Sequence, residues 1–92
     1  MSQIAYINSK YIKFKDAKIH IEDRGLQFAD SIYEVVTIFN KKLIDLQFHL
    51  QRLKFSLAEL NIKYKVDDKK LINFFEKLIE KNKISNGIVY LQ

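Results

Sequence analysis

Three polar residues of one predicted helix have spacings that bring them together, and one of them, an arginine, is of a type that suits anion binding. His49, Arg52 and Ser56 are three and four residues apart, so a helix over 46–60 places them along one edge of its apolar face. An arginine at the margin of a core keeps its guanidinium fixed and partly desolvated, and its fork of donors matches a pair of phosphate oxygens. The residues alone leave two alternatives open: Arg52 reaches out to water, or it pairs with His49 and only supports packing.

A second candidate site is the charged loop over 22–31, which leads into a predicted strand over 33–39. Loops that lead into a buried strand commonly carry binding residues. Gly25 stands where this loop has to turn sharply, and we expect it to adopt a positive φ. The alternative is a polar loop held only by an ion pair of Arg24 with Asp23 or Asp30.

The elements around these candidates are short strands. The N-terminal part predicts a hairpin of strands 4–7 and 11–14 around Asn8–Ser9, followed by either a third strand or an extended approach over 18–21. After the loop, strands 33–39 and 43–46 form a second hairpin around 40–42. Strand alternation places Tyr33 with Val35, Thr37 and Phe39 on one face, and Glu34 with Val36 and Ile38 on the other.

Two helices and a last strand follow. Asp45 is placed to cap the first helix, which carries a leucine stripe: Leu46, Leu50, Leu53, Leu57 and Leu60. A link over 61–66 leads to a second helix, capped by Asp67 or Asp68 and running to about Lys81, and a strand over 88–92 closes the chain. The sequence predicts a single α+β domain over 1–92, with a small antiparallel β-sheet and two consecutive helices packed on one face.

Composition narrows the class of protein. The 92 residues are 48% hydrophobic, enough for a core, and contain no cysteine for disulfides or thiolate chemistry. No apolar run approaches the roughly 20 residues of a membrane span, and the N-terminus from Met1 to Ile4 lacks the features of a signal peptide. We therefore expect a cytoplasmic protein without a membrane partner.

The net charge of +5 raises the question of a nucleic-acid partner. The lysines are scattered along the chain and only two arginines are present, whereas nucleic-acid surfaces favour arginine with interleaved aromatic residues. A solvated lysine surface without nucleic acid is the expectation. His20 is expected to be exposed, and no second histidine or carboxylate is spaced to make it a metal ligand.

Several motifs in order carry a resemblance to a known family. They are Glu22–Gly25 with Gln27-Phe28, Asp30-x-x-Tyr33-Glu34-Val35-Val36, His49–Leu53 and Gly87–Gln92. Together they resemble the N-terminal small domain of class IV aminotransferases, the pyridoxal-phosphate family that includes D-alanine and branched-chain aminotransferases. The resemblance is closest to the D-alanine type and covers nearly the whole chain.

The resemblance implies roles for three residues. Arg52 corresponds to the arginine that binds the phosphate of the cofactor, His49 supports it, and the hydroxyl of Tyr33 binds the carboxylate of the substrate. The alternative for Tyr33 is an aromatic residue packed in the core. The family's Schiff-base lysine and the acidic partner of the pyridine nitrogen belong to the larger C-terminal domain, so we expect no catalytic residue within these 92 residues.

Three functions remain open from the sequence. The first is the N-terminal portion of a D-amino-acid aminotransferase, truncated or split, inactive alone and binding no pyridoxal phosphate alone. The second is a non-catalytic remnant that self-associates, and the third is a basic nucleic-acid-binding module. The expected partners are a second copy or a second polypeptide that supplies the large domain.

Overall fold

The computed structural model describes residues 3–92 and has the α+β fold that the sequence predicts. Met1 and Ser2, part of the N-terminus in which we expect no signal peptide, lie outside the described residues. The elements in chain order are β1 (Ile4–Ile7), β2 (Lys10–Lys13), η1 (Phe14–Asp16), α1 (Arg24–Phe28), β3 (Glu34–Phe39), β4 (Lys42–Leu43), α2 (Leu46–Glu59), α3 (Asp68–Asn82) and β5 (Gly87–Leu91).

Both predicted hairpins form, and each turns through two residues with positive φ. Asn8 and Ser9 (φ 48° and 72°) join β1 to β2, and Asn40 and Lys41 (φ 49° and 64°) join β3 to β4. Two positive φ values in succession give the turn whose twist matches that of paired strands. Asparagine adopts this conformation more readily than most residues, which explains its place at the start of each turn.

The strands pair antiparallel, as expected, but they form two sheets. One consists of β1 and β2, and the other has the order β4-β3-β5. The small sheet is held against α3 by the amide of Asn82, which accepts a hydrogen bond from Ile4 N at 2.8 Å and donates one to Ile4 O at 3.0 Å. The ring of Tyr6 also stacks on that of Phe74, with centroids 4.4 Å apart.

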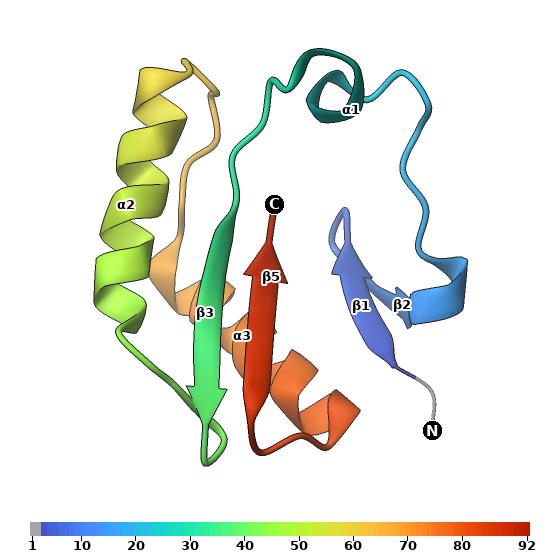
Figure 1. Cartoon of the computed structure of the whole chain (residues 1–92), viewed down its shortest axis with the longest axis vertical. Coiled ribbons are helices and arrows are strands. Elements are labelled where there is room, and N and C mark those ends of the chain that lie inside the picture. Colours follow the sequence, from blue (N-terminus) through green and yellow to red (C-terminus); the bar gives the residue numbers. More distant parts are fainter. Residues whose placement is uncertain (1–2) are drawn as a thin grey trace.

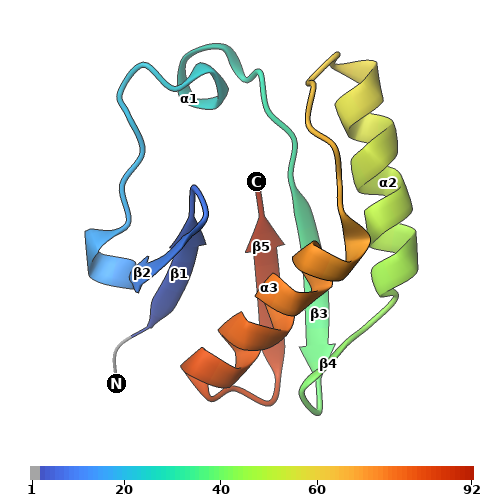
Figure 2. The same ribbon diagram turned by 180° about the vertical axis from the view of Figure 1, so that it is seen from behind.

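The two long helices, α2 (Leu46–Glu59) and α3 (Asp68–Asn82), lie on one side of the three-stranded sheet. Figure 2 shows α3 crossing in front of β5 and β3, whereas Figure 1 views the sheet from the face that α3 does not cover. The core between sheet and helices consists of Val36, Ile38, Leu50, Leu53, Leu57, Leu71, Phe75, Ile79 and Val89. Burial alternates strictly along β3, which confirms the predicted division of its residues between two faces.

Some predicted boundaries are wrong. The strand predicted over 43–46 ends at Leu43, because Leu46 already begins α2. Asp45 does precede α2, but its φ is 53° and its side chain makes no capping hydrogen bond. Leu60 follows the end of the helix and is 45% exposed, so it does not extend the buried stripe.

Other expectations are resolved by the structure. Residues 18–21 form no strand: residues 18–20 lead to the loop without regular secondary structure, and a turn begins at Ile21. Of the two caps proposed for the second helix, Asp67 is the one used, since its carboxylate accepts a hydrogen bond from Lys70 N at 3.2 Å. Within residues 3–92, no helix has the length and apolar character needed to cross a membrane.

Candidate functional site

The strand β3 carries an acidic side chain on the face that packs against the helices. Glu34 shares this face with Val36 and Ile38. It is 5% exposed and is the one buried polar or charged residue among residues 3–92. A carboxylate withdrawn from water stays ionised only if it is paired and hydrogen-bonded. Glu34 therefore requires charged partners from the neighbouring helix.

The helix α2 supplies two partners, His49 and Arg52. The Arg52 guanidinium donates from Nε to Glu34 Oε2 and from Nη2 to Oε1, both at 2.8 Å, and His49 Nδ1 lies 2.7 Å from Oε1. Because an ionised carboxylate only accepts hydrogen bonds, His49 Nδ1 carries the proton in this contact. Residues three apart on a helix face the same side, so both side chains reach the strand together. We call Glu34, His49 and Arg52 the carboxylate clamp.

These contacts explain the charge states within the clamp. The hydrogen bonds from Arg52 lower the pKa of Glu34, the contact with His49 acts in the same direction, and both outweigh the opposing effect of burial. In return, Glu34 raises the pKa of Arg52. The buried carboxylate and the guanidinium are therefore both charged at neutral pH.

Arg52 keeps donors that the clamp does not use. Guanidinium has five N–H groups, and Glu34 accepts from two of them, on the Nε–Nη2 edge. The side chain is 52% exposed, and the structure between residues 3 and 92 gives its remaining N–H groups no protein acceptor. The Phe48 ring lies 5.4 Å below Cζ. The outer edge of a fixed, charged guanidinium thus faces solvent, ready for an external anion.

Tyr33 lies at the surface rather than in the core. It is 64% exposed and stacks against Tyr90 of β5, with ring centroids 5.8 Å apart and planes at 18°. The alternative of a core aromatic is wrong for Tyr33.

The loop before Tyr33 is more ordered than predicted. Its middle forms the short helix α1, in which Asp23 Oδ1 accepts a hydrogen bond from Gly25 N at 2.9 Å. Of the two ion pairs considered, Arg24 with Asp30 is present, at 2.8 Å, while Asp23 serves as the cap. The loop is thus held from both ends by its own side chains.

The prediction that Gly25 adopts a positive φ is wrong, although a glycine is required at this position. Gly25 has no positive φ, and the left-handed residue of this loop is Ala29, with φ 55°. A Cβ on Gly25 would lie 2.9 Å from Ser31 Cβ and 3.0 Å from Asp23 Oδ1. Glycine is needed because the chain folds back against itself at this point. Ser31 Oγ also accepts a hydrogen bond from Gln92 Nε2 at 2.9 Å, which ties the loop to the end of β5.

The structure brings Arg52, His49 and Tyr33 to one end of β3, but Glu34 was not anticipated. A signal for Glu34 was present: it is an acid at the same strand phase as two residues of the apolar core. His20 is exposed, as expected, and its Nδ1 accepts from Glu22 N at 3.0 Å. Residues 3–92 contain no group of three His, Cys, Asp or Glu side chains placed to hold a metal.

The comparisons with known proteins match segments that include Tyr33, Glu34, His49 and Arg52. A family model described as amino-transferase class IV matches residues 31–92. The chain is similar to the D-alanine aminotransferase of Listeria monocytogenes, with 38% identity over 86 residues, which are 94% of this chain and 30% of that protein. It is also similar to the D-alanine aminotransferases of Staphylococcus epidermidis and Staphylococcus aureus, with 32% and 31% identity over 87 residues, 95% of this chain. The chain spans 31% of the length of these two relatives.

Proposed function

This chain belongs to the class IV aminotransferase family, and we propose that it forms the N-terminal part of a pyridoxal-phosphate-dependent D-amino-acid aminotransferase of the D-alanine type. The observation that carries the proposal is the carboxylate clamp. A half-exposed arginine is held on one edge by a buried carboxylate and presents its other edge to solvent. This is how a protein prepares a guanidinium to receive phosphate oxygens.

The clamp residues fit the phosphate of the cofactor. Arg52 would donate to the phosphate through Nη1 and the remaining N–H of Nη2, because Glu34 occupies the Nε–Nη2 edge. Glu34 acts as a positioning residue, and His49 holds the carboxylate by its second contact with Oε1. When bound, pyridoxal phosphate supplies the electron sink that amino transfer requires.

Tyr33 suits the recognition of the substrate. Its hydroxyl belongs to an exposed ring, and Tyr33 precedes Glu34 of the clamp directly in the chain, so the hydroxyl is free to donate a hydrogen bond to a carboxylate. Stacking against Tyr90 restricts the ring to one orientation. The choice of a D-amino acid rests on the names of the relatives, all D-alanine aminotransferases.

We further propose that residues 1–92 need a complementary polypeptide for activity. Each lysine among them is exposed, whereas an amine that reacts with a carbonyl at neutral pH is usually desolvated or placed beside another cation. The catalytic lysine, the partner of the pyridine nitrogen and most of the cofactor contacts would come from that polypeptide. The isolated chain is then expected to bind no pyridoxal phosphate.

Complementation tests this proposal. The chain is mixed with the part of the Listeria monocytogenes D-alanine aminotransferase that follows the matched segment, and the affinity for pyridoxal phosphate is followed by cofactor absorbance. Arg52→Ala is expected to weaken cofactor binding about tenfold or more, the effect of losing a charged hydrogen-bond donor. Lys77→Ala, an exposed α3 variant, is the matched control. Equal affinities for Arg52→Ala and the unsubstituted chain would refute the role of Arg52.

A second candidate function, self-association, is favoured by the uncovered face of the three-stranded sheet. Large apolar side chains are exposed there on neighbouring strands: Tyr33, Val35, Phe39, Ile88 and Tyr90. Contiguous apolar surface of this kind marks a protein interface. We propose that this face binds either a second copy or the complementary polypeptide. Sedimentation as a monomer at micromolar concentration, with the complementary polypeptide absent, would exclude the second copy.

A further inference from the structure

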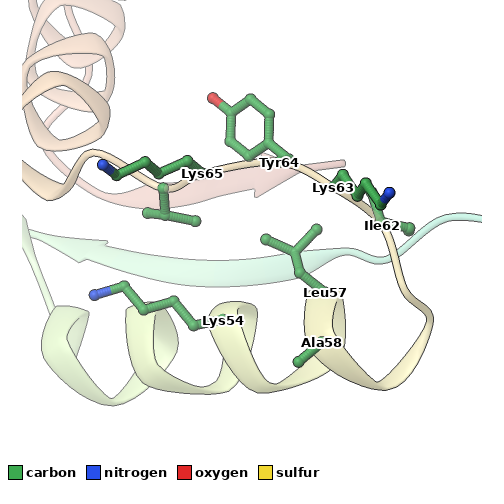
Figure 3. Close-up of a pocket in the computed structure, with 8 residues that line it drawn as sticks. Lys54, Leu57, Ala58, Ile62, Lys63, Tyr64 and Lys65 are labelled. Atoms are coloured by element: carbon green, nitrogen blue, oxygen red, sulfur yellow. The ribbon is translucent and has the colours of Figure 1, made fainter.

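An apolar groove lies on the far side of α2, away from the carboxylate clamp. It runs between the last turns of α2 and the segment that leads to α3 (Figure 3). Its volume is about 490 Å³. The lining residues are Lys54, Leu57, Ala58, Ile62, Lys63, Tyr64, Lys65 and Val66. The proposed aminotransferase function uses none of these residues.

The floor of the groove is aliphatic. Leu57 is buried, Ile62 and Val66 pack against the core from the other side, and Ala58 lies exposed at the edge. Ala58 adds only a methyl group to the lining. The groove is largely open to solvent, so a ligand would lie along this floor rather than be enclosed.

The rim of the groove is cationic. Figure 3 shows Lys54 and Lys65 extending in the same direction from the two walls, while Lys63 points toward the other end. Lys54 is bridged to Asp68, with Nζ 3.0 Å from Oδ1. Among the residues that the structure describes, Lys63 and Lys65 have no salt bridge. Lys54 and Lys65 against Asp68 leave one uncompensated positive charge at one end of the groove, and Lys63 adds a positive charge at the other end.

We propose that this groove binds amphipathic aliphatic carboxylates, with the acyl chain along the aliphatic floor and the carboxylate between Lys54 and Lys65. An apolar floor alone would bind any apolar ligand without selecting its head group. The cations on both walls select an anionic head, and the open shape accepts an unbranched chain. The inference is independent of the aminotransferase proposal, because no residue is shared between the two sites.

The probe for this site is sodium octanoate, titrated into the ¹⁵N-labelled chain and followed by amide chemical shifts. Saturable shifts are expected at 54–58 and 62–66. Shortening the probe to hexanoate removes two methylene groups and is expected to weaken binding about fourfold, the effect of two half-buried methylenes. Acetate, which has the charge without the chain, is expected to give no saturable shifts.

Variants separate this site from the open sheet face. Ala58→Leu fills the groove and is expected to weaken octanoate binding at least fivefold, while circular dichroism confirms the fold, since leucine is nearly as good a helix former as alanine. Lys65→Ala is expected to weaken binding severalfold, and Lys18→Ala, outside the groove, to leave it unchanged. Asp68→Asn removes the competing carboxylate and is expected to strengthen binding. Shifts centred on Val35 and Ile88, or equal responses to acetate and octanoate, would overturn the proposal.

Discussion

Replacing Glu34 with glutamine removes the buried charge of the carboxylate clamp and keeps the volume of the side chain. The carboxylate accepts three hydrogen bonds, one from His49 and two from Arg52. A glutamine amide accepts through one atom only and turns an NH2 group toward these donors. The variant therefore loses contacts and gains a donor that faces another donor.

The size of the effect follows from the exposure of the partners. A hydrogen bond to a charged group contributes roughly 1.5–3 kcal/mol, but water replaces part of the lost contact at the half-exposed Arg52. We expect Glu34→Gln to lower the free energy of unfolding by about 1–2 kcal/mol at pH 7. This corresponds to a midpoint about 1 M lower in urea. Glu76→Gln, at an exposed position of α3, is the matched control and is expected to change stability by less than about 0.5 kcal/mol.

The pH dependence of this difference is the sharper test. The pKa of Glu34 is lower in the folded chain than its ordinary value of 4.5, chiefly because of Arg52. Its contribution is therefore fully present above pH 4.5 and is lost as the pH falls through the folded-state pKa. Urea unfolding at a series of pH values should show the difference between the chain and Glu34→Gln shrinking below pH 4.5. A difference that stays constant down to pH 2 would refute the assignment of the charge to Glu34.

Four further substitutions test the packing, the turns and the helix caps. Ile38→Ala, at a residue 2% exposed, is expected to lower the free energy of unfolding by about 2–5 kcal/mol, measured by urea unfolding. Gly25→Ala places a Cβ against Ser31 and is expected to cost about 1–3 kcal/mol; Ser31→Gly in the same chain should recover most of this loss, and an additive double variant would contradict the contact. Asp67→Ala removes a formed helix cap and is expected to cost about 1 kcal/mol. Asp45→Gly, at a left-handed position without a cap, is expected to stabilise the chain by up to about 1 kcal/mol in thermal unfolding.

Elements whose residues repeat at a regular spacing could be predicted from the sequence. The stripe of α2 through Leu57 and the alternation along β3 are each written in consecutive residues, so each needs only its own segment. Asp45 shows the limit of this reasoning. An aspartate before an apolar helix has the composition of a cap, but the backbone reaches α2 through a left-handed residue, and the side chain then makes no cap hydrogen bond.

The candidate site also has one part that the sequence predicted and one part that it did not. The motifs around His49, Arg52 and Tyr33, read together, were sufficient to predict the family, whereas the anion site at Arg52 stays a prediction. What holds Arg52 in place could not be predicted, because Glu34 is 18 residues away in the chain. That contact exists only after α2 packs on β3 and withdraws the carboxylate from water.

The order of neighbouring residues was thus enough to predict most strands, the two long helices and the family of this protein. The tertiary structure alone decided that one strand residue would be a buried carboxylate facing α2, that Gly25 would lie against Ser31, and that α2 would border a lysine-rimmed groove. The physical reason is that periodicity is a property of neighbours in sequence. The burial of a carboxylate and the close contact of two backbone segments depend on which distant segments pack together. The tertiary structure alone determines this.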